Sequence, residues 1–169
     1  MNASPQDLFA FLNQNEIAND TFEHPAVFTV EESKQLRGPI DGGHTKNLFL
    51  KDKKSRLFLI VALEETRIDL KRVHEVIGGQ GRVSFGSGEL LEEVWGVKPG
   101  SVTPFGAIND KTHRVTVVLD AEMMKLGRLN FHPLINTMTT GISSEGLVTF
   151  LRATGHEPLI AALPAPAPV

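Results

Sequence analysis

The 169-residue chain is 41% hydrophobic and 22% charged, a balance typical of one globular domain and not of a disordered or fibrous chain. The absence of cysteine excludes disulfides, thiolate nucleophiles and sulfur-bound metals. A formal net charge of −3 argues against a protein that coats nucleic acids without sequence preference.

The N-terminal residues and the apolar runs predict neither export nor membrane insertion. Residues 1–7 lack the basic and apolar regions of a secretory signal. The longest apolar run, residues 57–63, is far shorter than the roughly 20 residues that span a bilayer. We therefore expect a cytoplasmic protein without a membrane partner.

Two helices are expected near the N-terminus. Ser4 is a good N-cap, Pro5 suits the first helical position and Asp7 places an acid in the first turn. This first helix should run to about residue 15. Thr29 and Glu32 have capping-box spacing and predict the start of a short second helix.

Residues 46–51 and 56–63 predict a β-hairpin, joined by the turn 52–55. The two strands are centred on continuous apolar residues, so we expect both faces to be buried in a central sheet. From Lys46 to Arg56 the hairpin carries five basic residues and one acidic residue, which leaves a local excess of positive charge. This excess fits either a solvated turn or a small landing site for phosphates.

Two helices and a short strand should follow the hairpin. Asp69 can cap a helix that stops at Gly78, and residues 82–85 predict a strand. Ser87 opens the next helix, whose apolar residues face inward, and Gly96 is a suitable residue to end it.

The C-terminal part combines strands with one helix. Strands are expected over residues 113–119, 128–131 and 137–142. Ser143 or Ser144 should cap an amphipathic helix that ends at Gly155.

Strands and helices mix along the chain without a regular βαβ alternation. We therefore expect a single α+β domain around a mixed sheet, with residues 1–163 forming the domain. The Pro- and Ala-rich residues 164–169 should form an extended, frayed tail.

Several familiar motifs are out of place in this chain. Residues 78–81 are rich in glycine but follow a predicted helix, so they predict a turn and not a dinucleotide site. Ser143 lies in a near match to the nucleophile-elbow pattern, but the second glycine comes one residue late and a helix cap fits better. The six histidines lack the spacing of a metal site, and we expect neither metal nor cofactor.

Three segments, far apart in sequence, each place a polar or special-backbone group beside a strand that we expect to be buried. They are residues 44–50 with Lys46, residues 100–106 with a Gly-x-x-x-Pro loop from Gly100 to Pro104, and residues 132–137 with the dipeptide His132-Pro133. In this order and spacing they resemble the YbaK/ProX-type aminoacyl-tRNA deacylases, a family that also occurs as an editing insertion in some bacterial prolyl-tRNA synthetases. The likeness covers nearly the whole chain, to about Leu163.

The resemblance implies a barrel-like mixed sheet surrounded by helices and the hydrolysis of an aminoacyl ester on tRNA. Residues 128–158 look like the free-standing branch specific for alanine mischarged onto proline tRNA. We therefore expect a trans-editing deacylase of alanyl-tRNA(Pro). The same fold could edit another small amino acid, cysteine or serine, or could serve as a noncatalytic tRNA-binding or regulatory module.

The family pattern implies catalytic roles for three positions. Lys46 matches the essential lysine and should contact the 3′ end of tRNA, although it could also be one of several hairpin lysines. Gly100 begins the loop whose backbone N–H groups could line the oxyanion site, unless the loop is a plain turn. His132 could hydrogen-bond the substrate or hold the pocket, or it could be a structural core histidine.

Further positions follow from the same likeness. The residues expected to bind the amino acid are Ser101, Val102, Thr103, Pro104 and Asn136. Lys46, Lys51 and Arg82 are expected to bind tRNA, the last two at acceptor-stem phosphates. The expected partners are the acceptor end of mischarged tRNA(Pro) and either prolyl-tRNA synthetase or an elongation factor, and we expect a monomer.

Overall fold

The computed structural model describes residues 1–26 and 40–168. The α-helices are α1 (Pro5–Gln14), α3 (His74–Ile77), α4 (Gly88–Trp95) and α5 (Ser144–Ala153). The 3₁₀ helices are η1 (Pro99–Ser101), η2 (Pro104–Asn109) and η3 (Met123–Lys125). The strands are β1 (Asn19–Glu23), β2 (Gly43–Lys51), β3 (Leu57–Leu63), β4 (Ser84–Phe85), β5 (Val115–Asp120), β6 (Arg128–Phe131), β7 (Met138–Ser143) and β8 (Leu159–Ala161).

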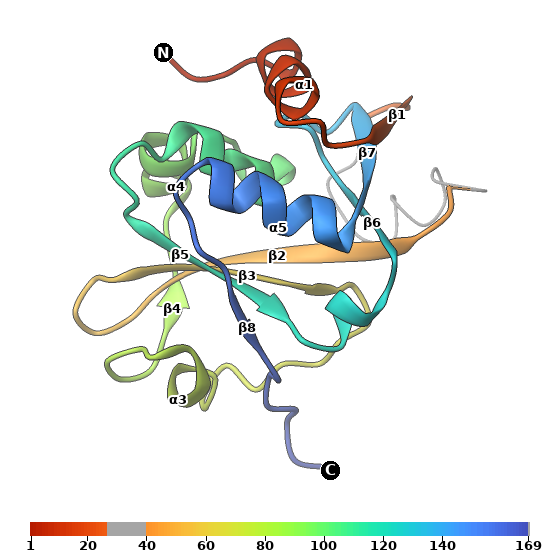
Figure 1. Ribbon diagram of the computed structural model, residues 1–169. Helices are drawn as coiled ribbons and strands as arrows, with labels where there is room; N and C mark the ends of the chain where they lie inside the picture. The colour runs from red at the N-terminus through yellow and green to blue at the C-terminus, as the bar shows by residue number, and fades with distance from the viewer. Residues whose placement is uncertain (27–39, 169) are drawn as a thin grey trace.

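The described strands form one mixed sheet of eight strands (Figure 1). They lie in the order β1-β7-β6-β2-β3-β5-β8, and β4 pairs with the C-terminal end of β2. β2 is parallel to β6, and β5 is parallel to both β3 and β8. The other neighbouring strands are antiparallel. This mixed sheet with its helices confirms the expected α+β class.

Helices cover the sheet on two sides, and each side has its own core. Figure 1 shows α4 and α5 on one side of the central strands and α3 on the opposite side. Side chains of β3 alternate between the two cores. Leu57, Leu59 and Val61 pack in the larger core, and Phe58 and Ile60 pack in the smaller core near α3. β3 is therefore buried on both faces, as its apolar run predicted.

Local sequence signals determine the helix ends as expected. Ser4 caps α1 through a capping box, in which the Asp7 carboxylate accepts a hydrogen bond from the Ser4 N–H at 2.9 Å. Ser87 and Ser143 cap α4 and α5. α4 ends at Gly96, whose φ of 72° lies in the left-handed region that favours glycine. These predictions are confirmed.

Other expectations need correction. In β2 only Phe49 and Leu50 are buried, and residues 43–48 are half-buried; three of these, His44, Thr45 and Asn47, line a cavity. After Asp69 the chain makes turns and becomes regularly helical only over His74–Ile77. β4 covers only the last two residues of the strand expected before α4.

The C-terminal segment adds a strand that the sequence pattern did not predict. β8 pairs with β5 and extends the sheet. Beyond β8, the Pro164 carbonyl accepts a hydrogen bond from the Asp69 N–H at 2.7 Å. The helix expected to start at Thr29 lies outside the described residues. Among the described helices, none has the length and apolar character to cross a membrane.

Candidate active site

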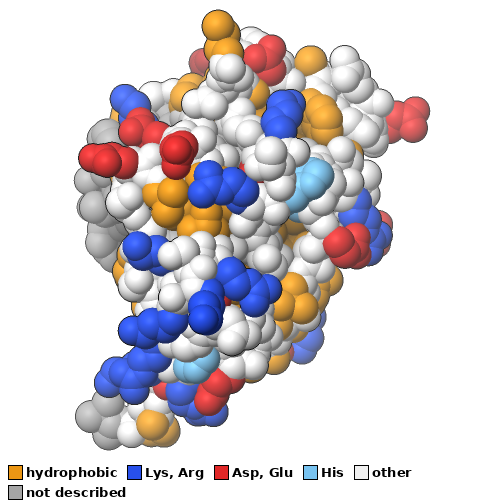
Figure 2. Space-filling model, turned by 90° about the vertical axis from the view of Figure 1, so that its left-hand side faces the viewer, with side chains coloured by type: hydrophobic (Ala, Val, Ile, Leu, Met, Phe, Trp, Pro, Cys, Tyr) orange, Lys and Arg blue, Asp and Glu red, His pale blue; other side chains and the backbone are white. Residues whose placement is uncertain are grey.

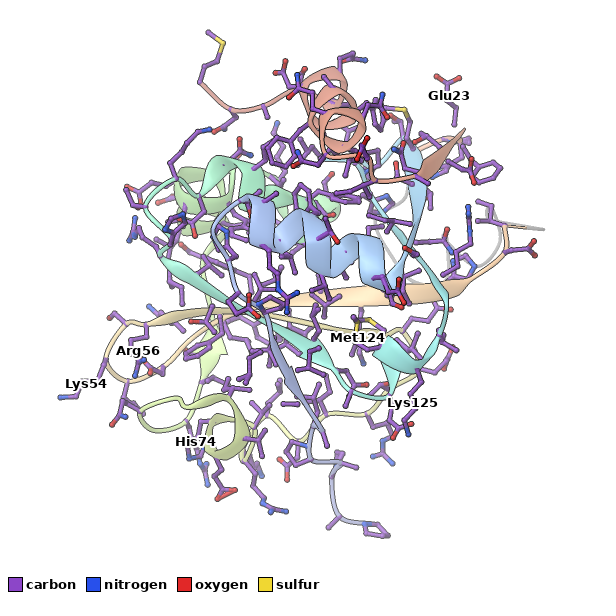
Figure 3. All side chains as sticks on the ribbon, in the orientation of Figure 1. Glu23, Lys54, Arg56, His74, Met124 and Lys125 are labelled. Atoms are coloured by element: carbon purple, nitrogen blue, oxygen red, sulfur yellow. The ribbon has the colours of Figure 1, made fainter. Side chains whose placement is uncertain are left out.

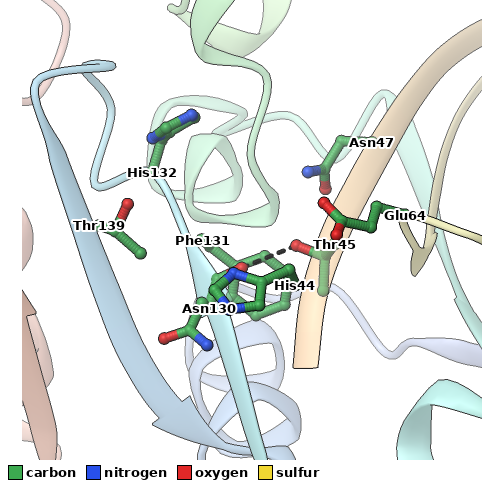
Figure 4. Close-up of a pocket in the computed structure, with 8 residues that line it drawn as sticks. All are labelled: His44, Thr45, Asn47, Glu64, Asn130, Phe131, His132 and Thr139. Atoms are coloured by element: carbon green, nitrogen blue, oxygen red, sulfur yellow. Dashed lines mark hydrogen bonds between the residues drawn. The ribbon is translucent and has the colours of Figure 1, made fainter. Parts of the chain in front are cut away.

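A small cavity lies where β2, β6 and β7 meet (Figure 4). Its volume is about 50 Å³. The residues that line it are His44, Thr45, Asn47, Glu64, Asn130, Phe131, His132 and Thr139. Most of these side chains are polar, which distinguishes the cavity from the apolar core that surrounds the sheet.

The cavity forms because β2 and β6 are paired over only two residues. The two strands run parallel at Gly43 and His44, after which β6 soon ends at Phe131 while β2 continues. The Thr45 hydroxyl donates to the Asn130 carbonyl at 2.7 Å and bridges the strands where the pairing stops. The space beyond this bridge is the cavity.

Asn130 holds the start of β2 in place and also offers an acceptor. Its Nδ2 donates to the carbonyls of Asp41 at 2.8 Å and Gly43 at 3.3 Å. Its Oδ1 is buried without a hydrogen-bond partner among the described residues, and the same holds for Oδ1 of Asn47. Leaving a buried acceptor unpaired costs about 1–3 kcal/mol, which a donor group of a ligand would recover. Both asparagines line the cavity, which therefore suits ligands with N–H or O–H groups.

His132 enters the cavity from the turn that follows β6. Its Nδ1–H donates to the Met138 carbonyl at 2.9 Å, which leaves the lone pair of the neutral ring on Nε2. Burial lowers the pKa of His132 below its usual 6.5; the Met138 carbonyl opposes this shift and the nearby His24 adds to it. His132 is thus neutral at pH 7 and can accept a hydrogen bond through Nε2.

The turn after His132 has a strained backbone. Leu134 has a φ of +73°, and its N–H donates to the His132 carbonyl at 3.0 Å across Pro133. A non-glycine residue in this region costs on the order of 1–3 kcal/mol. The Leu134 side chain is buried in the larger core, and this packing offsets the strain. The buried leucine thereby holds the turn in place, and the hydrogen bond to the Met138 carbonyl orients the ring of His132.

A second histidine lies near the first. The ring of His24 is centred 6.2 Å from that of His132. His24 Nδ1 is 2.8 Å from the Pro25 carbonyl, and Nε2 is 2.7 Å from the Thr139 hydroxyl. Because a carbonyl only accepts, Nδ1 is the donor in the first of these bonds, and Nε2 pairs with the Thr139 hydroxyl. Thr139, which lines the cavity, is held in one orientation by this bond.

The site therefore combines a neutral imidazole with buried amide oxygens and a carboxylate, that of Glu64. No group of three His, Asp or Glu side chains in the described ranges is placed to hold a metal ion. Such an arrangement can orient donor groups of a substrate and a water molecule.

Sequence comparison assigns the part of the chain that forms this cavity to a known family. The model of the aminoacyl-tRNA editing domain matches residues 24–150, which include every residue that lines the cavity. The chain belongs to the aminoacyl-tRNA editing domain family. A Xenopus laevis relative, prolyl-tRNA synthetase associated domain-containing protein 1, is 38% identical over 92% of this chain and 94% of its own. The prolyl-tRNA editing protein ProX of Acetoanaerobium sticklandii is 34% identical over 89% of this chain and 92% of its own.

A solved structure agrees with this assignment at the level of the fold. It is described as a candidate trans-editing enzyme for prolyl tRNA synthetase, and it matches with a TM-score of 0.73 at 19% identity. The match covers 98% of this chain and 99% of that chain. The editing-domain fold and the expected YbaK/ProX-type family are therefore confirmed.

The lysine singled out in this editing domain, Lys46, points away from the cavity. Its neighbours Thr45 and Asn47 line the cavity and Lys46 does not, as the alternation of side chains along a strand predicts for these three. His44 also lines the cavity, at the position where β2 stops pairing with β6. Its Nζ donates to the Thr66 carbonyl. The structure therefore does not bring Lys46 together with His132.

The Gly100–Pro104 loop of the editing domain does not line the cavity, and only the adjacent residue Phe105 packs against the cavity wall. Most of the loop is buried, and its Thr103 carbonyl accepts a hydrogen bond from Trp95 Nε1 at 2.7 Å. The next residue, Phe105, packs its ring 5.8 Å from that of Phe131, centre to centre, and Phe131 lines the cavity. The loop therefore positions Phe105, which packs against Phe131 in the wall of the cavity.

The remaining predicted positions lie farther away. Asn136 is half-buried in the turn before β7 but does not line the cavity. Lys51 and Arg82 lie at the opposite end of β2, where Lys51 pairs with Ser84. His44 and Lys51 are seven positions apart along the strand, a distance of about 23 Å at roughly 3.3 Å per residue.

Of the residues that line the cavity, sequence reasoning assigned a role only to His132. It missed Glu64, Asn130, Phe131 and Thr139 altogether, and also His24 beside the cavity. None belongs to a local motif, because strand pairing brings them together. Glu64, for example, directly follows β3, and its N–H donates to the His44 carbonyl at 2.9 Å. For Asn47 the sequence did offer a signal. Residues two positions apart in a strand point to the same side, so Asn47 is expected on the same side of the strand as Thr45.

Proposed function

We propose that the protein is a trans-editing hydrolase that deacylates mischarged alanyl-tRNA(Pro). The family supplies the class of reaction, and the relative ProX is by name a prolyl-tRNA editing protein. The observation that supports alanine as the edited amino acid is the small volume, about 50 Å³, of the cavity beside His132.

The size of the cavity favours a small side chain. A water molecule needs about 10–15 Å³, so a cavity of about 50 Å³ admits a methyl group and an attacking water. On the same scale, the three ring methylenes of proline and an attacking water need about 40–60 Å³, which leaves no free space in the cavity. A site that selects proline discriminates against smaller amino acids by only about 1–3 kcal/mol per methylene. A second site too small for proline supplies the missing discrimination.

The chemistry is the hydrolysis of an activated ester between alanine and the terminal adenosine. It requires a positioned water and stabilisation of a tetrahedral oxyanion, and no covalent nucleophile. We assign His132 Nε2 and Asn47 Oδ1 as acceptors for the α-ammonium and ribose hydroxyl of the substrate. A neutral histidine fits this role, and the ribose hydroxyl assists the attack of water.

Lys46 and the Gly100–Pro104 loop have supporting roles in this proposal. The Lys46 ammonium suits a phosphate at the tRNA 3′ end, which it reaches by exchanging the Thr66 carbonyl for a phosphate oxygen. The loop supports the wall of the cavity through the packing of Phe105 on Phe131.

Release of free amino acid tests the proposed function. The purified protein is expected to release alanine from alanyl-tRNA(Pro) and to spare prolyl-tRNA(Pro). Parallel assays with seryl- and cysteinyl-tRNA(Pro) test the other small amino acids, and faster release of either would contradict alanine specificity. Binding of tRNA without turnover at micromolar enzyme would identify a noncatalytic module.

Lys46→Ala is expected to remove most of the activity, because it removes the proposed contact with the tRNA 3′ end. The protein should stay folded, because Lys46 is only half-buried and its amine bonds to one carbonyl. Lys125→Ala removes an exposed lysine on η3 and serves as the control. Deacylation rates and thermal unfolding curves are compared for both variants. Full activity in Lys46→Ala would exclude Lys46 from the mechanism.

A further inference from the structure

Glu64 places a carboxylate in the lining of the cavity. Neither lysine nor arginine is among the lining residues that the structure describes. His132, on another part of the wall, is neutral at pH 7 because burial lowers its pKa below 6.5. A carboxylate in a partly enclosed site attracts a cationic group of a ligand more strongly than a neutral one. The cavity should therefore distinguish ligands by charge as well as by size.

Positive side chains gather away from the cavity. Figure 2 shows Lys and Arg side chains on the face that contains the turn between β2 and β3, and Figure 3 places Lys54 and Arg56 at this turn. Lys51, at the same end of β2, is seven positions along the strand from His44, which lines the cavity. The negative charge of the cavity is thus separated from this positive surface by most of the length of β2.

The backbone around Glu64 is fixed by bonds to the two central strands. Its N–H donates to the His44 carbonyl at 2.9 Å, which extends the antiparallel pairing of β2 and β3 by one residue. The Thr66 N–H donates to the Leu63 carbonyl at 3.0 Å and closes a turn around Glu64. Figure 4 shows the Glu64 carboxylate pointing toward Asn47. Glu64 is therefore held on the side of the cavity that β2 forms.

Asn47 provides a second acceptor on this side of the cavity. Its Oδ1 is buried without a hydrogen-bond partner among the described residues. A carboxylate and an amide oxygen both accept hydrogen bonds, so neither satisfies the other. A ligand group with a positive charge and several N–H groups can donate to both. The α-ammonium of an aminoacyl ester is such a group, because it has three N–H groups and a pKa of about 8.

The neutral acceptors of the site do not distinguish an ammonium from an alcohol. His132 Nε2 and Asn47 Oδ1 accept a hydrogen bond from an N–H or an O–H group alike. A hydrogen bond between two ionised groups is roughly twice as strong as one between neutral groups. The Glu64 carboxylate is the lining group that gains from a positive charge on the ligand.

We propose that Glu64 is a specificity-determining residue, which binds the α-ammonium of the substrate and restricts hydrolysis to esters with a free α-amino group. Esters with a hydroxyl in place of the α-ammonium, or with an acylated α-nitrogen as in a peptide, lack the cation and are rejected. The identity of the ester rests on the proposed function. Selection by charge at Glu64 adds to the selection by side-chain size and is separable from it.

Binding of two non-hydrolysable analogues tests Glu64 without any turnover. In the first, an amide joins alanine to the 3′ carbon of adenosine. In the second, lactic acid replaces alanine, so a hydroxyl takes the place of the α-ammonium and the shape is nearly unchanged. The wild type should bind the alanyl amide about 10- to 150-fold more tightly, the range for a hydrogen bond to a charged group.

Glu64→Gln should abolish this preference, because the amide has a similar shape but no charge, and it should leave the affinity for the lactyl amide unchanged. Titration calorimetry measures both affinities at pH 7. Equal affinity of the wild type for the two amides would overturn the proposal. Equal weakening of both amides in Glu64→Gln would overturn it as well, since the substitution would then act on the shape of the cavity.

Glu65→Gln is the matched control, because Glu65 is the next acid in the same loop, is exposed and does not line the cavity. It should keep the wild-type preference for the alanyl amide. Loss of the preference in Glu65→Gln would show that the charge of the whole loop selects the ligand, which would contradict the assignment to Glu64. Thermal unfolding verifies that both variants are folded.

Hydrolysis of the tRNA esters provides the second measurement. Deamination of alanyl-tRNA(Pro) gives lactyl-tRNA(Pro), and each kcat/KM is divided by the uncatalysed rate of the same ester, because an α-ammonium itself activates the ester. The wild type should prefer the alanyl ester by about 10- to 150-fold, and Glu64→Gln should cleave both equally. An unchanged preference in Glu64→Gln would exclude the role of Glu64. If the wild type cleaves neither ester, the proposed function fails, and the binding of the two amides alone decides the role of Glu64.

Discussion

Two histidines show how their surroundings decide what the same side chain can do. His132 borders the cavity, with Nδ1 bonded to a backbone carbonyl and Nε2 left as an acceptor. His156 is 4% exposed, and its ring nitrogens lie 2.9 Å from the Thr154 hydroxyl and 2.9 Å from the Asp110 carboxylate. His132 can meet a substrate, whereas both nitrogens of His156 are used within the fold.

The partner of His156 explains why that region is structural. Asp110 also accepts hydrogen bonds from the N–H groups of Arg114 at 3.0 Å and Val115 at 2.9 Å, at the start of β5. Burial raises the pKa of Asp110, but its bonds to His156 and to these N–H groups outweigh burial and lower it below 3.8. Asp110 therefore contributes stability above its unfolded pKa and loses it as the pH falls through the lowered folded value.

The largest expected effect is the loss of stability in His156→Ala. The substitution leaves the Asp110 carboxylate buried without its imidazole partner. Breaking such a buried pair costs about 3–5 kcal/mol in the free energy of unfolding, which lowers Tm by roughly 10 °C. Chemical and thermal denaturation at pH 7 measure this loss.

His113→Ala is the control for that substitution. His113 is exposed, and its ring packs 5.1 Å from the ring of His156, centre to centre. Its removal should cost less than about 1 kcal/mol. A similarly small cost for His156→Ala would show that the buried pair does not support the fold.

His132→Ala should have the opposite profile, with activity lost and stability nearly unchanged. A hydrogen bond to a charged substrate group is worth about 1.5–3 kcal/mol, so kcat/KM for alanyl-tRNA(Pro) should fall by about 10- to 150-fold. Initial rates and unfolding curves are measured on the same preparations. Unchanged kcat/KM, or a stability loss as large as that of His156→Ala, would make His132 a structural residue.

The pH dependence of activity should separate His132 from an exposed histidine. Its pKa lies below 6.5 because of burial, so kcat/KM should hold as the pH is lowered to 6.5. Below that value the ring gains a proton, and activity should fall by up to about tenfold per pH unit. The profile is measured after subtracting uncatalysed ester hydrolysis. An inflection above 6.5 that disappears in His132→Ala would contradict the lowered pKa.

Thr139→Val should have the smallest effect. It removes the hydroxyl that lies 2.7 Å from His24 Nε2 and nearly keeps the shape of the side chain. The loss of one neutral hydrogen bond, about 0.5–1.5 kcal/mol, should lower kcat/KM by roughly two- to tenfold. If Thr139 attacked the ester with His24 as its base, the variant would be inactive. Single-turnover rates distinguish the two outcomes.

The helix ends and the central hairpin could be predicted because their signals are local. The Ser87 hydroxyl, for example, accepts a hydrogen bond from the Leu90 N–H at 3.1 Å, three residues away. The apolar run of β3 likewise predicted burial on both faces, and side chains of β3 pack in both cores. Such features depend on propensity and periodicity alone.

The cavity could not be predicted in the same way, because its residues meet through long-range pairing. The Thr45 hydroxyl meets the Asn130 carbonyl across 85 positions of sequence. One correction was available from the sequence, however. Lys46 and Asn47 are adjacent in a strand and face opposite sides, and of the two only Asn47 lines the cavity. The family resemblance directed attention to Lys46, and the geometry adds Asn47.

Single-turnover release of the amino acid from alanyl-tRNA(Pro) and from prolyl-tRNA(Pro) tests the central claim most directly. The cavity beside His132 should accept alanine and exclude the larger ring of proline. We predict that the folded protein releases alanine at least about fivefold faster than proline, since overfilling a packed site costs about 1–3 kcal/mol. Release of proline at an equal rate, or no release of alanine by protein that binds tRNA, would contradict the account.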